Sequence, residues 1–368
     1  MSDPRYTPLR DRHESLGASF TDFGGWQMPV RYTSDLAEHH AVRQAAGIFD
    51  ISHMAEFTVR GAEADAYLDH ALAGRLSALA VGKAKYSLLL AETGGIIDDV
   101  IVYRLDDDDY LVISNAGNRD AVREALSART DGFTVEVDDV SDDYALIAVQ
   151  GPNAEAILAD TEGVADVSIP WSEQRYYAWA TATFGGEPLL LARTGYTGED
   201  GFELLVPAAL AGQLWDAVVA AGEPHGLIPA GLAARDTLRL EAGMPLYGHE
   251  LTLDTKPAQA GLGRVVVTAK ESFVGKDAVE PASDARVLVG LAADGKRAGR
   301  AGYAVVTEDG TPIGEITSGA LSPTLGHPIA MAYVDPSSAA EGSAVFLDVR
   351  GTRIPATVTA LPFYRRTK

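Results

Sequence analysis

Cysteine is missing from all 368 residues of the sequence. Its absence excludes disulfide bonds, thiolate nucleophiles and thiolate metal ligands, and it fits the cytoplasmic location that we expect. The eight histidines form no His-x-x-x-His pair, so we expect no metal site. Any catalysis by this chain would therefore depend on oxygen and nitrogen side chains.

Long apolar runs and an excess of basic residues are also missing. No stretch has transmembrane length, and the polar start Met-Ser-Asp-Pro-Arg does not resemble a signal peptide. The 30 Lys and Arg residues are outnumbered by 52 Asp and Glu residues, which gives a formal net charge of -22. A polyanion would be repelled over most of such a surface. We therefore expect contact with neither membrane nor nucleic acid.

Several familiar ligand and nucleophile motifs are absent as well. The sequence has no Gly-x-Gly-x-x-Gly fingerprint, no P-loop and no Gly-x-Ser-x-Gly elbow. Bound nucleotides, including flavin dinucleotides, and acyl-serine chemistry consequently lose support.

The periodicity predicts α+β structure followed by a β-rich end. Thr7 is expected to cap a first helix, with Pro8 at its first position, and Gly47 to follow a second helix. From residue 287 onward, short strands separated by Gly, Pro and Asp indicate a small β-barrel or sandwich. Further predicted elements are helices at 62–73, 119–128 and from 154, strands at 84–90, 99–103, 110–114 and 144–150, and a turn at 106–109.

Two adjacent carboxylates, Asp98 and Asp99, interrupt the apolar strand pattern from Ile96 to Tyr103. Side chains alternate between the two faces of a strand, so at least one carboxylate points where the pattern expects hydrocarbon. A buried carboxylate is costly unless it is compensated, which makes this pair a candidate site. The alternative is a strand end at which both acids reach water, and the pattern alone does not separate the two.

Two other segments place charges beside apolar residues. Residues 193–204 resemble a hairpin in which Glu203 lies between two apolar neighbours, and residues 235–241 open a charged helix. An internal salt bridge among these charges is one interpretation. A ligand with several hydrogen-bonding edges is the other.

Eight segments, in this order along nearly the whole chain, closely resemble the aminomethyltransferase (T-protein) family of the glycine cleavage system. They are residues 23–29, 49–54, 83–87, 94–99, 149–152, 194–199, 234–242 and 317–326.

The resemblance implies an α+β fold of three domains arranged as a ring around a central folate-binding hole. The first domain would combine residues 1–51 and 141–250, the second would be a ferredoxin-like insertion at 52–140, and the third a C-terminal β-barrel at 251–368.

The resemblance also implies a reaction of glycine catabolism and one-carbon metabolism. The family transfers the one-carbon unit of the aminomethyl-lipoyl H-protein to tetrahydrofolate, and it releases 5,10-methylenetetrahydrofolate, ammonia and dihydrolipoyl H-protein. The implied partners are lipoylated H-protein and tetrahydrofolate as co-substrate, with no metal or flavin.

Matching motifs imply roles for individual residues. The second aspartate of the family's pair is the catalytic one, here Asp99, which would polarise folate and steer proton transfers. Tyr86 would line the pocket, and Tyr196 would hydrogen-bond near the same centre.

The remaining implied residues bind folate. Glu203 would accept hydrogen bonds from the pterin edge, and Arg235 would act with it. Asn115 would lie along the pocket, and Arg365 would meet the folate tail. The family's Gly-Leu-Gly-Ala-Arg-Asp carries Ala233 here, which matters only if that position needs a positive φ.

Two alternatives share this fold. A non-catalytic folate-binding relative typically carries a Lys-Gly-Cys signature, which a chain without cysteine lacks. Another folate-dependent demethylase of the superfamily would act on a different substrate.

Docking of an acidic H-protein to a chain of charge -22 needs a local basic patch. The alternative is that such cations are only solvated surface charge. The candidate cations are Lys296, Arg297, Arg300, Arg365, Arg366 and Lys368.

Overall fold

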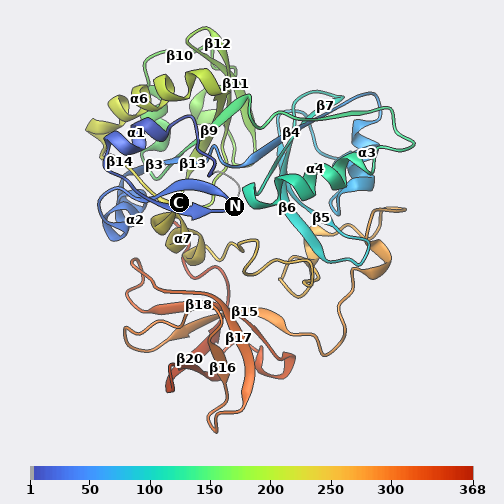
Figure 1. Cartoon of the computed structure of the whole chain (residues 1–368), viewed down its shortest axis with the longest axis vertical. Coiled ribbons are helices and arrows are strands. Elements are labelled where there is room, and N and C mark those ends of the chain that lie inside the picture. Colours follow the sequence, from blue (N-terminus) through green and yellow to red (C-terminus); the bar gives the residue numbers. More distant parts are fainter. Residues whose placement is uncertain (1–3, 368) are drawn as a thin grey trace.

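The computed structural model describes residues 4–367, in which helices and strands form three parts (Figure 1). Lys368, one of the candidate docking cations, lies outside the described residues. No helix in this range is long and apolar enough to span a membrane.

A seven-stranded sheet forms the first part, with strand order β10-β11-β12-β13-β9-β3-β14. Helices α5 and α6 pack on one face through an apolar cluster that includes Trp215 and Phe202, and Leu9, just before α1, belongs to the same cluster. The strands are β3 (Ala46–Asp50), β9 (Tyr144–Gln150), β10 (Val164–Ala165), β11 (Trp179–Phe184), β12 (Glu187–Ala192), β13 (Gly201–Pro207) and β14 (Leu227–Pro229). The hairpin β1 (Ser19–Phe23) and β2 (Trp26–Arg31) and the helices α1 (Arg10–Ser15), α2 (Asp35–Gln44), α5 (Ala154–Ala159), α6 (Ala211–Gly222) and α7 (Leu232–Glu241) complete this part.

A five-stranded sheet, ordered β5-β6-β7-β4-β8, forms the second part between β3 and β9 in the chain. Without the edge strand β5, the succession β4-α3-β6-β7-α4-β8 and its antiparallel pairing match the ferredoxin-like motif, so that expectation is confirmed. Its elements are β4 (Ala55–Arg60), α3 (Ala64–Ala71), β5 (Ala84–Leu90), β6 (Ile96–Arg104), β7 (Asp109–Ser114), α4 (Arg119–Ser127) and β8 (Glu136–Asp139).

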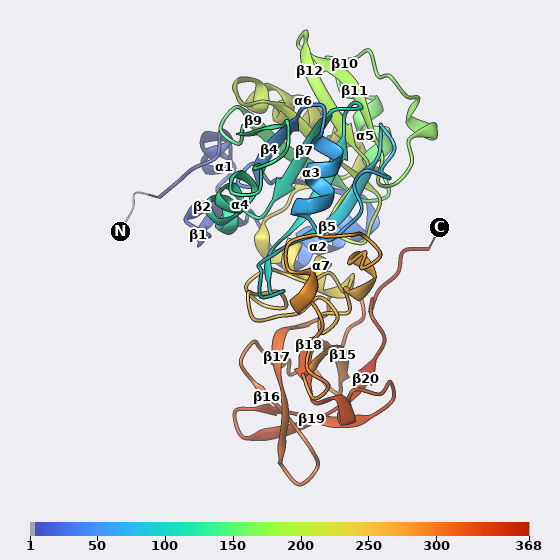
Figure 2. The same ribbon diagram turned by 90° about the vertical axis from the view of Figure 1, so that its right-hand side faces the viewer.

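The third part is a closed six-stranded barrel, ordered β15-β18-β17-β16-β19-β20, which confirms the β-barrel expected from residue 287. Closure leaves no strand edge unpaired around the barrel wall. Figure 2 shows the barrel below the other two parts and the final residues returning upward from it. The strands are β15 (Val287–Ala293), β16 (Ala304–Val306), β17 (Pro312–Leu321), β18 (Pro328–Val334), β19 (Ala344–Val349) and β20 (Thr352–Thr359).

An apolar cluster between the two sheets and α7 joins the first two parts. It combines Phe49 and Leu146 of the large sheet, Tyr103 and Ile113 of the small sheet, and Leu238 of α7. The face of β6 that carries Tyr103 therefore looks toward the large sheet. The sheet memberships support the proposed borders at residues 51, 140 and 250, which stay a prediction.

Two local predictions near the N-terminus are wrong. Thr7 is not the N-cap residue of α1, which begins at Arg10 and has Leu9 at its N-cap position. The Thr7 hydroxyl accepts a hydrogen bond from the main-chain N–H of Leu9 at 3.3 Å and donates one to Oδ2 of Asp50 at 2.5 Å, so it stabilises the turn before the helix. Gly47 does not follow the second helix directly but lies within β3. A Cβ there would come within 2.5 Å of Cγ2 of Val42, so close packing accounts for this glycine better than a helix end does.

Candidate active site

The Asp98–Asp99 pair lies within β6, where the two carboxylates point to opposite faces. Asp98 is fully buried, whereas Asp99 is part-exposed. Val100 and Val102 share the face of Asp98 and belong to the core under the helices, so Asp99 shares the opposite face with Tyr103. The expectation that at least one acid enters hydrocarbon surroundings is confirmed, and the solvated strand end is excluded.

Asn115, which directly follows β7, lies between the two carboxylates. Its Nδ2 donates to Oδ1 of Asp98 and to Oδ1 of Asp99, both at 2.8 Å, and its main-chain N–H donates to Oδ2 of Asp98 at 2.9 Å. Tyr86, on β5, donates from its hydroxyl to Oδ2 of Asp99 at 3.1 Å. The structure therefore brings three of the predicted site residues into direct contact.

The surroundings raise the pKa of both carboxyl groups. Burial, followed by the charge of Asp99, raises the pKa of Asp98 to about 7, against hydrogen bonds from Asn118 and Asn115. Burial also raises the pKa of Asp99, although Tyr86 and Asn115 oppose the shift by hydrogen bonding. A carboxylate of raised pKa accepts a proton more readily than an ordinary carboxylate does.

Glu203 and Arg235 form a second polar group nearby. Glu203, on β13, accepts a hydrogen bond from Oγ1 of Thr194 at 2.5 Å, and burial raises its pKa. Burial lowers the pKa of Arg235, on α7, while the charge of Glu203 opposes that shift. Within residues 4–367 no ion pair joins the two, and one terminal nitrogen of Arg235 is buried without a hydrogen-bond partner.

The salt-bridge interpretation therefore holds for only part of the charged segments. Arg239 pairs with Glu250 at 3.0 Å, and Glu241 pairs with Arg43 at 2.8 Å. Glu203 and Arg235 instead remain unpaired with each other, which leaves them able to bind a polar ligand. The helical backbone at Ala233 in α7 removes the doubt that its methyl group raised.

Tyr196 and Arg365 occupy different surroundings. The Tyr196 hydroxyl donates to the carbonyl of Pro245 at 2.6 Å, and its ring lies 4.9 Å from the Arg235 guanidinium carbon. Tyr196 is close enough to Asp99 that the carboxylate contributes to its raised pKa. Arg365 is exposed in the last segment of the chain, and its binding role stays a prediction.

Sequence reasoning missed Tyr177 and Asn118. Tyr177 has a φ of 57°, and burial raises its pKa with smaller contributions from the charges of Glu203 and Asp99, so it lies near both polar groups. No sequence signal marks this left-handed tyrosine. Asn118 donates to Oδ1 of Asp98 at 2.7 Å, and the spacing Asn-x-x-Asn directly after a strand could have indicated it.

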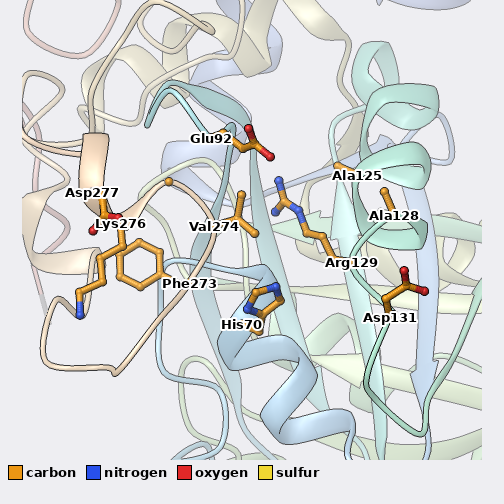
Figure 3. A pocket seen from close by; sticks show the side chains of 11 residues that line it. His70, Glu92, Ala125, Ala128, Arg129, Asp131, Phe273, Val274, Lys276 and Asp277 are labelled. Atoms are coloured by element: carbon orange, nitrogen blue, oxygen red, sulfur yellow. The ribbon is translucent and has the colours of Figure 1, made fainter.

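A cavity of about 620 Å³ lies elsewhere, between α3, α4 and the segment at 273–277 (Figure 3). None of the predicted site residues lines it. Its Arg129 donates to the carbonyls of Ala71 and Leu90, and its Lys276 donates to those of Lys270 and Glu271. These two cations therefore already have partners within the protein. Within residues 4–367 no group of three or more His, Asp or Glu could hold a metal ion.

Comparison with known proteins identifies the family. Residues 9–270 match the model of the GCVT N-terminal domain, and residues 286–365 match that of the glycine cleavage T-protein C-terminal barrel domain. These two matches define the class as a T-protein fold with its barrel.

Full-length relatives carry the comparison further. The chain is 57% identical over 373 residues to an aminomethyltransferase of Cutibacterium acnes and 53% identical over 370 residues to that of Saccharopolyspora erythraea, each with 100% of both chains covered. The crystal structure of the glycine cleavage system aminomethyltransferase T from Bartonella henselae matches with a TM-score of 0.90 at 37% identity, over 99% of each chain. The chain belongs to the aminomethyltransferase (T-protein) family of the glycine cleavage system. The resemblance seen in the sequence is confirmed, and neither alternative member of the superfamily is favoured.

Proposed function

We propose that this protein transfers the one-carbon unit of the aminomethyl-lipoyl group on H-protein to tetrahydrofolate. The products are 5,10-methylenetetrahydrofolate, ammonia and dihydrolipoyl H-protein. The observation that carries the proposal is the part-exposed carboxylate of Asp99, which receives hydrogen bonds from Tyr86 and Asn115 at the face between the two sheets. Full-length identity to aminomethyltransferases supports the same reaction.

The unpaired polar groups fit a pterin. Glu203 offers a carboxylate to the adjacent N–H donors of the pterin ring, and Arg235 has a buried nitrogen without a partner. We place the ring between these two residues and Asp99, with the Tyr196 ring 4.9 Å from the guanidinium carbon of Arg235. Arg365, exposed on the returning C-terminal segment, is proposed to meet the folate tail.

Tetrahydrofolate supplies the two amine nitrogens, N5 and N10, that accept the one-carbon unit. In the balanced reaction these nitrogens lose two protons, one of which ends on ammonia and the other on the released thiol. Asp99 is placed to take up and return a proton, and its raised pKa suits that role. Tyr86 and Asn115 hold its carboxylate in one orientation, so that the transfer begins from a fixed geometry.

One assay tests the proposal. Purified protein is mixed with aminomethyl-loaded H-protein, and ammonia release is measured with and without tetrahydrofolate. We expect folate to accelerate release strongly and methylenetetrahydrofolate to appear in equal amount. An equal rate of ammonia release with and without tetrahydrofolate, or no release at all, would contradict the assignment.

A further inference from the structure

Asp98 lies beside the proposed catalytic residue but points to the opposite, helix-covered face of β6. It is fully buried and has no route to substrate. We propose that Asp98 is a positioning residue that fixes the Asp99 carboxylate through the side-chain amide of Asn115. This inference rests on the role given to Asp99 under the proposed function.

The contacts of Asn115 carry the inference. Its amide nitrogen has two hydrogens, and the two carboxylates at 2.8 Å take one each. An amide turned by 180° would point its oxygen at two carboxylates, so Asp98 selects the orientation that leaves a hydrogen for Asp99. The main-chain N–H of Asn115 donates to the second oxygen of Asp98, which fixes the residue at two points.

Asn118 holds Asp98 in turn. Its side-chain amide donates to Oδ1 of Asp98 at 2.7 Å and to the carbonyl of Ile97 at 3.2 Å. The turn that carries both asparagines packs closely on the β1–β2 hairpin, since a Cβ added to Gly24 would come within 3.3 Å of Cα of Gly117. The segment at 23–29, recognised in the sequence without a role, therefore supports the turn that positions Asp99.

The two carboxylates also share their electrostatic surroundings. Asp98 faces Asn115 and Asn118, and Asp99 lies near Tyr86 of β5, Tyr177 before β11 and Tyr196 before β13. Tyr247, after α7, lies near both carboxylates. No cation within residues 4–367 pairs with either carboxylate. The negative charge of one carboxylate therefore opposes the ionisation of the other. Removing the charge of Asp98 should consequently change the proton affinity of Asp99.

A double-mutant cycle separates positioning from an independent role. Asp98→Asn places an N–H group against hydrogen-bond donors and should lower the rate of folate-dependent ammonia release about 10- to 100-fold, as expected when a reacting group is misplaced. The KM for tetrahydrofolate should change less than twofold. Because a negative neighbour is lost, the acid limb of the pH–rate profile should move to lower pH.

The decisive comparison is with Asp99→Asn. If Asp98 acts through Asp99, the variant that carries both changes should be no slower than Asp99→Asn alone. The inference would be overturned if the rate losses of the two single variants multiply in the double variant. It would also be overturned if Asp98→Asn has normal turnover and a normal pH profile. Near-normal turnover in Asp99→Asn would instead refute the proposed catalytic site itself, so the two failures are distinguishable.

Two further variants control for folding. Asp69 also accepts three hydrogen bonds within the second part, from Leu76 and Ser77, but lies outside the site. Asp69→Asn should lower thermal stability without moving the pH profile. If Asp98→Asn does not fold, Asn118→Ala removes one of the three bonds to Asp98, and its smaller loss must also vanish in the Asp99→Asn background.

Discussion

Two groups of buried charges in this protein are organised in opposite ways. Glu241, at the junction of α2, α7 and the barrel, accepts hydrogen bonds from Arg43, Ser322 and Thr324, with His39 at 3.2 Å. These partners outweigh burial and lower its pKa to about 2. At the candidate site the carboxylates of Asp99 and Glu203 have raised pKa values, because burial outweighs their few neutral donors.

We call the charges around Glu241 the joining group, because they connect two parts of the protein. We call Asp99 and Glu203 the reacting group, because they can meet a substrate. A buried charge with all its partners in the protein holds two parts together and has nothing left for a ligand. A buried charge with too few partners costs free energy of folding but keeps its hydrogen-bonding capacity for a substrate. The first group lies where the barrel meets α7, and the second lies where the two sheets face each other.

The largest effect is expected from Asp99→Asn. The change keeps the shape of the side chain but removes its charge and basicity, so folate-dependent ammonia release should fall roughly 100- to 10,000-fold. Folate affinity and the unfolding temperature should stay near normal. Calorimetry and thermal unfolding check these two controls, and a stability loss as large as that of a Glu241 variant would erase the contrast between the groups.

The matching change in the joining group is Arg43→Met. It leaves the carboxylate of Glu241 buried without its arginine partner, which should cost about 3–5 kcal/mol of the free energy of unfolding. Urea unfolding measures this loss. The fraction that remains folded should bind folate normally, and a selective loss of folate affinity would place Arg43 in the site instead.

Acid should weaken the joining group in a defined range. The Glu241 carboxyl has a folded pKa of about 2 against an ordinary value of 4.5, so its contribution is complete above pH 4.5. It is lost as the pH falls through 4.5 toward 2, and at 1.36 kcal/mol per pKa unit the loss is about 3 kcal/mol. Glu241→Gln should remove most of this pH dependence from the unfolding free energy, and an unchanged acid slope would contradict the assignment.

Glu203→Gln should have a smaller effect, confined to the reacting group. The amide presents one carbonyl where the pterin needs two acceptors, and an unmatched donor costs ~1–3 kcal/mol, or a roughly 5- to 150-fold weaker folate affinity. The unfolding free energy should not decrease, since the lost charge was poorly compensated. Unchanged affinity by calorimetry would return Glu203 to a structural role.

The smallest effect is expected from cations that belong to neither group. Lys296 and Arg297 are exposed in the loop after β15, and reversing both to Glu should slow association with loaded H-protein roughly twofold to tenfold at low salt. Turnover with free aminomethyl-dihydrolipoamide should remain normal. Equal losses with both substrates would mean that the loop shapes the site and is not a docking surface.

Patterns along the chain predicted the regular elements better than the contacts between them. The strand at 84–90 coincides with β5 and the barrel begins at residue 287 as expected, because alternation and turn residues are local properties. The alternation of side chains in β6 also indicated that at least one carboxylate points where the pattern expects an apolar side chain. It did not reveal that Asn115 joins the two carboxylates, since that contact depends on how β7 pairs with β6.

The errors have a common physical origin in tertiary contacts. Thr7 has the character of a helix cap, but α1 begins only at Arg10, and the Thr7 hydroxyl instead links the main-chain N–H of Leu9 to a buried carboxylate of β3. The sequence could not decide whether Glu203 and Arg235 pair, because residues on β13 and α7 come together only in the folded chain. Recognition of the family motifs supplied the site residues that local patterns could not.

The position of β3 has a consequence for synthesis on the ribosome. This strand is complete at residue 50, but its antiparallel partner β9 starts at residue 144 and its parallel partner β14 at residue 227. The five-stranded sheet lies entirely between β3 and β9 in the sequence. It can therefore form while the main-chain groups of β3 are still unpaired. Contacts so distant in sequence form slowly. In the nascent chain β3 therefore remains without its sheet partners while nearly a hundred further residues are translated. During this interval its unpaired main-chain groups expose the chain to aggregation, which a chaperone would prevent.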